Sequence, residues 1–132
     1  MISAIVVEDS DVMRTIWREL VAAIADLSLA GEYRRVSSAI AAIRHQPPNV
    51  ILLDIQLNDG NGMDVMRMVA NECPVTKVIV VSNYADPIYR SHFAAAGAYA
   101  FYDKSRELAA VRSSLAHLAE CGSTIISSEC IF

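Results

Sequence analysis

The sequence predicts an α/β protein in which helices cover both faces of a parallel β-sheet. Short apolar runs alternate five times along the chain with segments whose apolar residues recur every three or four positions. The first pattern is typical of strands and the second of one helix face, and their alternation indicates βα units. The central apolar runs are continuous, as expected for strands that helices bury from both sides. A chain of 132 residues, 54% of them hydrophobic, suits one domain with a substantial core.

The first half of the chain begins with a β-branched run at residues 4–7, which predicts the first strand. Residues 13–27 carry an apolar stripe at spacings of three and four, which predicts the first helix, and Asp11 is a plausible N-cap. Residues 29–33 predict a second strand. Residues 36–43 form a shorter helical face that two consecutive prolines close.

The second half continues the alternation. Its predicted elements are strands at 50–53, 75–81 and 98–102, and helices at 63–69, 87–96 and 108–118. Pro87 suits the first turn of the fourth helix, where a missing N–H loses no partner, and Gly97 closes that helix. The chain shows no internal repeat and no linker between two domains. Residues 122–132 are too few to form a domain, so we expect them to be a short tail or the start of a linker.

Composition and charge disfavour several classes of protein. The net charge is −4 and no basic run occurs, which disfavours direct nucleic-acid binding because phosphate contacts require clustered Lys and Arg. No apolar run approaches the roughly 20 residues that span a bilayer, and the N-terminus does not resemble a secretion signal. We therefore expect a soluble, cytoplasmic protein without membrane contacts. Cys73, Cys121 and Cys130 show no metal-ligand spacing and are expected to be free thiols.

Polar side chains follow four of the five predicted strands. Glu8 and Asp9 come after the first strand, Asp54 after the third, Ser82 after the fourth and Lys104 after the fifth. Open parallel sheets bind ligands beyond the carboxyl ends of their strands, and neighbouring strands lie only about 4.8 Å apart. We therefore expect these five side chains to share one crevice.

The chemistry of this set indicates a magnesium-dependent phosphoryl site. The three carboxylates would repel one another unless a divalent cation joined them, and Mg²⁺ prefers such hard oxygen ligands. Lys104 and Ser82 suit an anion bound beside the metal. Asp54 ends the most central strand, so it is the predicted nucleophile, because carboxylates can form aspartyl phosphates.

Four motifs in this order resemble the receiver domain of two-component response regulators. They are VVED at 6–9, ILLD at 51–54, VVS at 80–82 and GAYAFYDKS at 97–105. The resemblance covers about residues 3–120 and implies a receiver domain at residues 1–121. It also implies a (βα)5 flavodoxin-like three-layer sandwich, with a five-stranded parallel sheet of order 2-1-3-4-5.

The resemblance also implies roles for individual residues. Asp54 would accept a phosphoryl group from a sensor histidine kinase, a phosphotransfer protein or a small donor such as acetyl phosphate. Asp9, Asp54 and the carbonyl of Gln56 would bind Mg²⁺ directly, and Glu8 would act largely through metal-bound water. The phosphoryl group on Asp54 would then attract Ser82 and Lys104, and a conformational change would follow.

The resemblance also assigns five positions to the switch and to the lifetime of the phosphorylated state. Lys104 and Ser82 would bind phosphoryl oxygens, and Phe101 would be the aromatic residue that turns inward as the Ser82 hydroxyl moves. Gln56 and Tyr84 occupy positions that control water access, and the bulk of Tyr84 predicts slow loss of the phosphoryl group. The face formed by residues 87–120 is a candidate surface for a partner or a homodimer.

Several positions depart from the commonest family pattern. Asn58 stands where proline is frequent, and Asn83 stands where a small residue is usual. Ser105 follows Lys104 where many members have a cis proline, and this Lys-Ser pair resembles receivers attached to LuxR-type helix-turn-helix outputs. Two interpretations therefore stay open: the receiver of a longer transcription factor and a standalone regulator.

Three other classes share parts of the pattern. A haloacid-dehalogenase-like phosphatase also uses an aspartate nucleophile with magnesium, but it needs a second acid where this chain has Gln56. A flavodoxin-like redox protein would need a phosphate-binding loop after the first strand, where Glu8 and Asp9 would repel a flavin phosphate. A degenerate receiver used only for interaction usually lacks the acceptor or the lysine, and both are present here.

Overall fold

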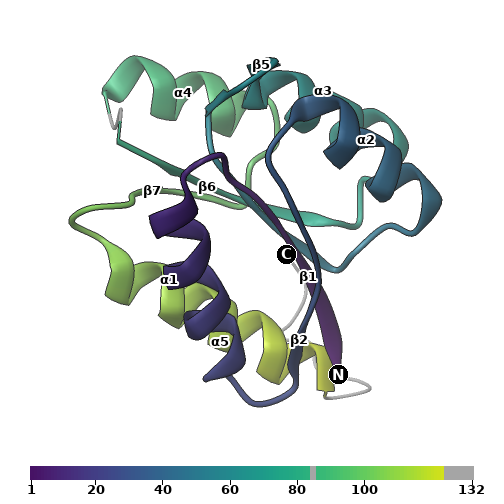
Figure 1. Cartoon of the computed structure of the whole chain (residues 1–132), viewed down its shortest axis with the longest axis vertical. Coiled ribbons are helices and arrows are strands. Elements are labelled where there is room, and N and C mark those ends of the chain that lie inside the picture. Colours follow the sequence, from purple (N-terminus) through teal and green to yellow (C-terminus); the bar gives the residue numbers. More distant parts are fainter. Residues whose placement is uncertain (84–85, 124–132) are drawn as a thin grey trace.

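The computed structural model describes residues 1–83 and 86–123. Its centre is a five-stranded parallel sheet in the order β2-β1-β3-β6-β7 (Figure 1). The strands are β1 (Ile2–Val7), β2 (Leu27–Tyr33), β3 (Val50–Leu53), β6 (Lys77–Ser82) and β7 (Ala100–Asp103). This order confirms the predicted 2-1-3-4-5 topology, with β6 and β7 as the fourth and fifth strands of the sheet.

Five helices cover the sheet and complete a three-layer sandwich. They are α1 (Asp11–Ala22), α2 (Val36–His45), α3 (Gly62–Glu72), α4 (Pro87–Ala95) and α5 (Leu108–Ser123). Figure 1 shows α1 and α5 on one face and α2, α3 and α4 on the other. The two faces arise because successive strand residues point in opposite directions.

Each face has its own hydrophobic cluster. On the α1/α5 side, Val6 and Leu52 pack with Trp17. On the opposite side, Leu53 packs with Ile43 of α2 and other residues of α2, α3 and α4. All four residues of β3 are fully buried, as the continuous apolar run at 50–53 predicts.

The structure corrects the predicted boundaries of the first helix and the second strand. Ser10, rather than Asp11, is the N-cap of α1, because its hydroxyl accepts the N–H of Met13 at 3.3 Å. The apolar stripe at 13–27 outruns the helix: α1 ends at Ala22, and Leu27 already belongs to β2. Helical and strand residues bury side chains on the same cluster here, so periodicity alone did not separate them.

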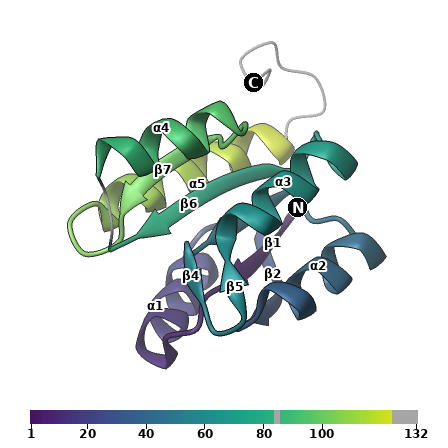
Figure 2. The same ribbon diagram turned by 90° about the horizontal axis from the view of Figure 1, so that it is seen from above.

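A short hairpin that the sequence pattern did not predict follows the third strand of the sheet. It consists of β4 (Gln56–Leu57) and β5 (Gly60–Asn61), which pair in antiparallel fashion next to the start of α3 (Figure 2). A strand of two residues is too short to show an alternating pattern.

The cysteines differ from one another. Cys73 is a buried free thiol, as expected. Cys121 forms a disulfide, which corrects the expectation of a free thiol there. An odd count requires only that one cysteine lack a partner within the chain, and it does not say which one. Cys130 and the rest of the predicted tail from residue 124 onward lie outside the described residues.

Within residues 1–83 and 86–123, no helix is long and apolar enough to cross a membrane.

Candidate functional site

The polar residues predicted to follow the strands lie at one edge of the sheet. The parallel register aligns Val7 of β1 with Leu53 of β3, so Glu8 and Asp54 leave neighbouring strands at the same level. In the same way, Ser82 of β6 pairs with Asp103 of β7, directly before Lys104. The backbone N–H of Lys104 donates to the carbonyl of Ser82 at 3.0 Å, which continues the sheet by one residue.

Lys104 joins the two most buried acids. Its Nζ lies 2.9 Å and 3.2 Å from the carboxylate oxygens of Glu8, and 3.2 Å from Oδ2 of Asp54. Glu8 is 0% exposed, and Asp54 and Lys104 are each 5% exposed. Buried charges are stable only when paired and hydrogen-bonded, and here one cation serves two carboxylates.

A small cavity opens beside these groups. Its volume is about 180 Å³, and it is lined by Asp9, Ser10, Asp54, Gln56, Asn83 and Lys104. Glu8 is not in this lining, because its carboxylate is turned into the protein. The lining contains the carboxylates of Asp9 and Asp54 and the ammonium group of Lys104. The cavity therefore suits a cation and an anion bound together.

Trp17 contacts the carboxylate of Glu8. The sequence analysis did not predict Trp17 as a site residue. Its indole Nε1–H donates to Oε1 of Glu8 at 3.2 Å, while the N–H of Ser10 donates to Oε2 at 3.2 Å. Trp17 fell within the apolar stripe of the first helix and was assigned to the core alone. The available signal was chemical: a buried indole N–H needs an acceptor, and Glu8 is nine residues away.

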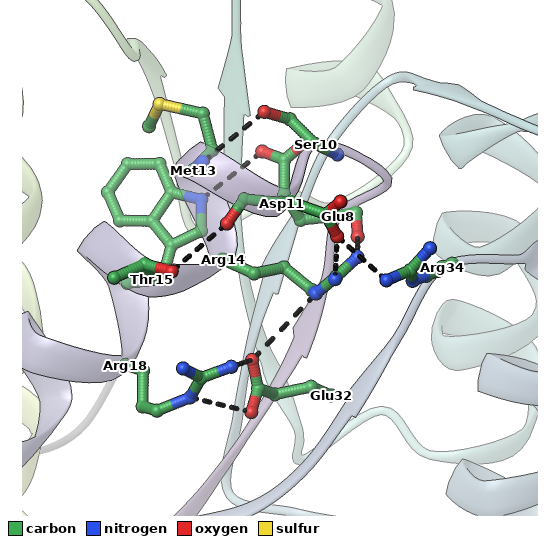
Figure 3. Close-up of polar contacts among 10 residues, drawn as sticks. Glu8, Ser10, Asp11, Met13, Arg14, Thr15, Arg18, Glu32 and Arg34 are labelled. Carbon is green, nitrogen blue, oxygen red and sulfur yellow. Dashed lines mark hydrogen bonds and ion pairs between the residues drawn. The ribbon is translucent and has the colours of Figure 1, made fainter.

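Charged residues of α1 brace the loop that carries Glu8 and Asp9 (Figure 3). Arg14 is buried, and its guanidinium donates to the backbone carbonyl of Glu8 at 3.4 Å and pairs with Asp11. Arg34, just after β2, also pairs with Asp11, at 2.7 Å. The start of α1 is therefore tied both to the acidic loop and to the edge of the sheet.

The pKa values of the two buried acids, Glu8 and Asp54, are shifted in opposite directions. Burial is the largest influence on Asp54, and with the nearby Glu8 carboxylate it raises the pKa of Asp54 to about 7. Burial also acts to raise the pKa of Glu8, but hydrogen bonds from Asp54, Lys104 and Trp17 outweigh it and lower that pKa. Burial would lower the pKa of Lys104, but the two carboxylates raise it. The free protein therefore keeps Glu8 and Lys104 charged, and Asp54 is the acid that holds a proton near neutral pH.

The acidic residues fit a hard divalent cation. Glu8, Asp9 and Asp54 each offer a carboxylate oxygen, and these oxygens all lie within 4.8 Å of one another. A cation bound there would offset the repulsion from Glu8, which adds to burial in raising the pKa of Asp54. Mg²⁺ is usually held by one or two carboxylates, together with water molecules. Gln56 begins β4 and lines the same cavity.

The loop after Asp54 folds tightly because of Gly62. The N–H of Gly62 donates to the carbonyl of Ile55 at 2.6 Å, and a Cβ at this position would collide with the carbonyl oxygen of Asp54. Glycine is therefore required by the close approach of two backbone segments.

Asp59, in the same loop, caps a distant helix and was also missed. Its carboxylate accepts the N–H of Val36 at 2.6 Å, and the N–H and hydroxyl of Ser37 at 3.2 and 2.9 Å. Arg35 is the N-cap of α2 and makes no capping bond with its side chain, so Asp59 takes this role from 22 or 23 residues away. Burial acts to raise the pKa of Asp59, but these hydrogen bonds lower it.

The predicted switch residues, Ser82 and Phe101, are not among the residues that line the cavity. Ser82 is fully buried at the end of β6, and Phe101 is half-buried in β7. The ring of Phe101 lies 5.9 Å from that of Phe93, and Arg90 of α4 lies over it at 5.1 Å. Tyr84, predicted to shield the phosphoryl group, lies outside the described residues.

This architecture, a 2-1-3-4-5 sheet with acids and a lysine at its carboxyl edge, defines a receiver-type signalling domain. A family model for the response regulator receiver domain matches residues 4–116. The chain therefore belongs to the receiver domain family of two-component response regulators. It is a signalling phosphoacceptor domain, and the phosphatase alternative is not favoured.

Part of each of several curated response regulators is similar to this chain. The DNA-binding transcriptional activator DevR/DosR of Mycobacterium tuberculosis is 30% identical over 112 residues, which are 83% of this chain and 52% of that protein. The response regulator GacA of Pseudomonas syringae pv. syringae is 27% identical over 109 residues, 83% of this chain and 51% of that protein. The chain thus spans about half the length of these relatives.

Solved structures support the fold. A LuxR-family DNA-binding response regulator from Staphylococcus aureus superposes with a TM-score of 0.82 at 22% identity, covering 90% of this chain and 99% of that one. The response regulator domain of Thermotoga maritima CheB gives a TM-score of 0.78 at 21% identity, covering 96% of this chain and 99% of that one.

Proposed function

We propose that Asp54 accepts a phosphoryl group from the phosphohistidine of a sensor histidine kinase or a phosphotransfer protein, with Mg²⁺ bound beside it. The observation that carries this proposal is the contact of Lys104 with Asp54 at a cavity that Asp9 and Asp54 line, with a carboxylate oxygen of Glu8 within 4.8 Å of theirs. Asp9, Asp54 and the carbonyl of Gln56 would hold the metal, and Glu8 would act indirectly. The metal would neutralise charge on the phosphoryl oxygens and on the carboxylates.

The transfer makes one bond and breaks one. An ionised oxygen of Asp54 attacks phosphorus, the new O–P bond forms, and the P–N bond to the donor imidazole breaks. Two contacts already orient the carboxylate of Asp54. The backbone N–H of Ile55 donates to its Oδ1 at 2.8 Å, and the Nζ of Lys104 donates to its Oδ2. Lys104 then exchanges its contact with Asp54 for a phosphoryl oxygen, and it keeps its contact with Glu8. Positioning and charge neutralisation are the main contributions a protein makes to such a step.

The added charge is then converted into a change of shape. A phosphoryl group adds nearly two negative charges and three acceptor oxygens. The Ser82 hydroxyl turns toward it, and Phe101 moves into the space that this leaves. The face at residues 87–120 changes as a result, which makes it the surface for a partner or for a second copy of the chain. We further propose that this change controls transcription through an output outside this chain. We also propose a cytoplasmic location, because a histidine kinase uses cytoplasmic ATP.

We assign the lifetime of the phosphorylated state to two side chains, those of Gln56 and Tyr84. Gln56 is exposed and lines the cavity, so it controls the approach of water. The resemblance to the family assigns the same role to Tyr84, through the bulk of its side chain. A Tyr84→Ala variant is expected to lose its phosphoryl group faster, which is measured by intact mass after removal of the donor.

Incubation with acetyl phosphate, followed by intact mass spectrometry, tests the main proposal. The wild-type chain is expected to gain one phosphoryl group in the presence of Mg²⁺ and none in excess EDTA. Asp54→Asn is expected to gain none. Asp64→Asn serves as the matched control, because Asp64 is an exposed acid in the first turn of α3. Phosphorylation of Asp54→Asn, or of the wild type without metal, would overturn the assignment.

A further inference from the structure

Lys104 lies in a short loop, residues 103–107, that joins β7 to α5. The loop contains no proline to fix its backbone, so hydrogen bonds must do so. Oδ1 of Asp103 accepts the N–H and the hydroxyl of Ser105, at 2.9 and 2.7 Å, and the N–H of Arg106 at 3.2 Å. The carbonyl of Asp103 accepts the N–H of Glu107 at 2.8 Å. These bonds order the interior of the loop.

Arg90 of α4 contacts the chain on both sides of Lys104. Its Nη1 donates to the carbonyl of Phe101 at 2.8 Å, three residues before Lys104, and its Nη2 donates to Oε1 of Glu107 at 2.8 Å, three residues after it. The same Oε1 accepts the N–H of Asp103 at 3.0 Å. One guanidinium therefore joins the end of β7 to the start of α5.

We propose that Arg90 and Glu107 form a clamp that positions the Lys104 loop for phosphoryl transfer. Arg90 is absent from the residues that line the cavity, so it acts through the backbone that carries Lys104. The inference deepens the proposed function, since it assumes that the Nζ of Lys104 must reach a phosphoryl oxygen. It also ties α4, part of the proposed output face, to the loop whose lysine senses the phosphoryl group.

The geometry requires arginine. A planar guanidinium directs separate N–H groups to the carbonyl and to the carboxylate, and its face also packs on the Phe101 ring. The ammonium group of lysine would carry the same charge but could not hold both acceptors and stack on the ring. The clamp is about one third exposed at both side chains, so water and salt weaken it, and its loss should change a rate by only about two- to five-fold.

The chain offers a matched control. Arg44 of α2 donates with Nε and Nη2 to Glu72 of α3, at 3.0 and 2.8 Å, and this ion pair also joins two elements at the surface. Five variants of the full chain are compared with the wild type: Arg90→Gln, Arg90→Lys, Glu107→Gln, the double variant Arg90→Gln/Glu107→Gln, and Arg44→Gln. Two measurements are made: amide hydrogen exchange of residues 103–107 without metal or donor, and the rate of phosphorylation by acetyl phosphate at saturating Mg²⁺.

We expect Arg90→Gln and Glu107→Gln to speed exchange in the loop and to slow phosphorylation by about two- to five-fold, with Mg²⁺ affinity unchanged. The effect of their double variant should be smaller than the sum of the two single effects, because both substitutions remove the contact between Arg90 and Glu107. Arg90→Lys should resemble Arg90→Gln, and Arg44→Gln should match the wild type.

Two results would overturn the clamp. One is loop exchange in Arg90→Gln that is no faster than in Arg44→Gln. The other is phosphorylation of Arg90→Gln that equals or exceeds the wild-type rate. If the wild type gains no phosphoryl group at all, the proposed function fails, and the exchange measurement alone then decides whether Arg90 holds the loop.

Discussion

At pH values above 7, replacing Asp54 with asparagine should increase the free energy of unfolding of the metal-free protein. Burial, together with the Glu8 carboxylate, raises the pKa of Asp54 from 3.8 to about 7. Between these values the folded protein holds a proton that the unfolded chain has released. The free energy of unfolding therefore falls as the pH rises from about 4 to about 7, by at most ~4 kcal/mol at about 1.4 kcal/mol per pH unit.

Asparagine has the shape of the protonated acid and does not titrate. Asp54→Asn should therefore escape this loss and be more stable than the wild type by ~2 kcal/mol at pH 8, part of the maximum being lost with the O–H of the acid. The difference should shrink toward pH 5. Saturating Mg²⁺ should stabilise the wild type and leave the variant nearly unchanged, because a ligand stabilises the state that binds it.

Urea unfolding in EDTA at pH 5, 6, 7 and 8 measures the effect, with the fluorescence of Trp17 as the probe. Trp17 is the only tryptophan of the chain and is fully buried. Asp64→Asn controls for the loss of an acid as such. The reasoning is refuted if the difference between wild type and Asp54→Asn does not vary with pH, or if the variant is the less stable protein at pH 8.

Three further predictions concern Trp17, which contacts Glu8, and two residues of the loop that follows Asp54. Trp17→Phe removes a donor to the buried Glu8 carboxylate and should lower the free energy of unfolding by about 1–3 kcal/mol, measured by urea unfolding followed by circular dichroism. Asp59→Ala removes the cap of α2, so it should speed amide exchange at the start of that helix at pH 7. This difference should fade as acid protonates the Asp59 of the wild type, whose lowered pKa makes its contribution a property of the ionised form. Gly62→Ala would push a methyl group onto the carbonyl of Asp54. We expect the free energy of unfolding to fall by about 1–3 kcal/mol and Mg²⁺ binding, measured by titration calorimetry, to weaken. Unchanged Mg²⁺ binding would contradict this prediction.

Local patterns in the sequence were enough to predict the layers of the fold. The continuous run at 50–53 predicted a strand buried on both faces, and β3 is completely buried. Because parallel strands end at one edge, the positions of Glu8, Asp54 and Lys104 just after three such runs already implied that they meet. The four family motifs added the strand order, which the sheet confirms.

Boundaries were harder to predict where two elements bury residues in the same cluster. The stripe that continued to Leu27 had helical spacing, but α1 stops at Ala22 and the chain turns through Asp26, whose φ is 64°. Apolar periodicity records which side chains are buried and does not record where the backbone turns.

The sequence by itself determined the alternation of strands and helices and the kinds of charged group at the sheet edge, because both follow from local periodicity and from the chemistry of single residues. Only the tertiary structure decided which partner each group takes: Trp17 for Glu8, the start of α2 for Asp59, and Glu107 with the Phe101 carbonyl for Arg90. These contacts depend on the relative placement of elements that are far apart in the chain. A hydrogen bond needs its two atoms within about 3 Å, and no local pattern specifies a distance between such segments.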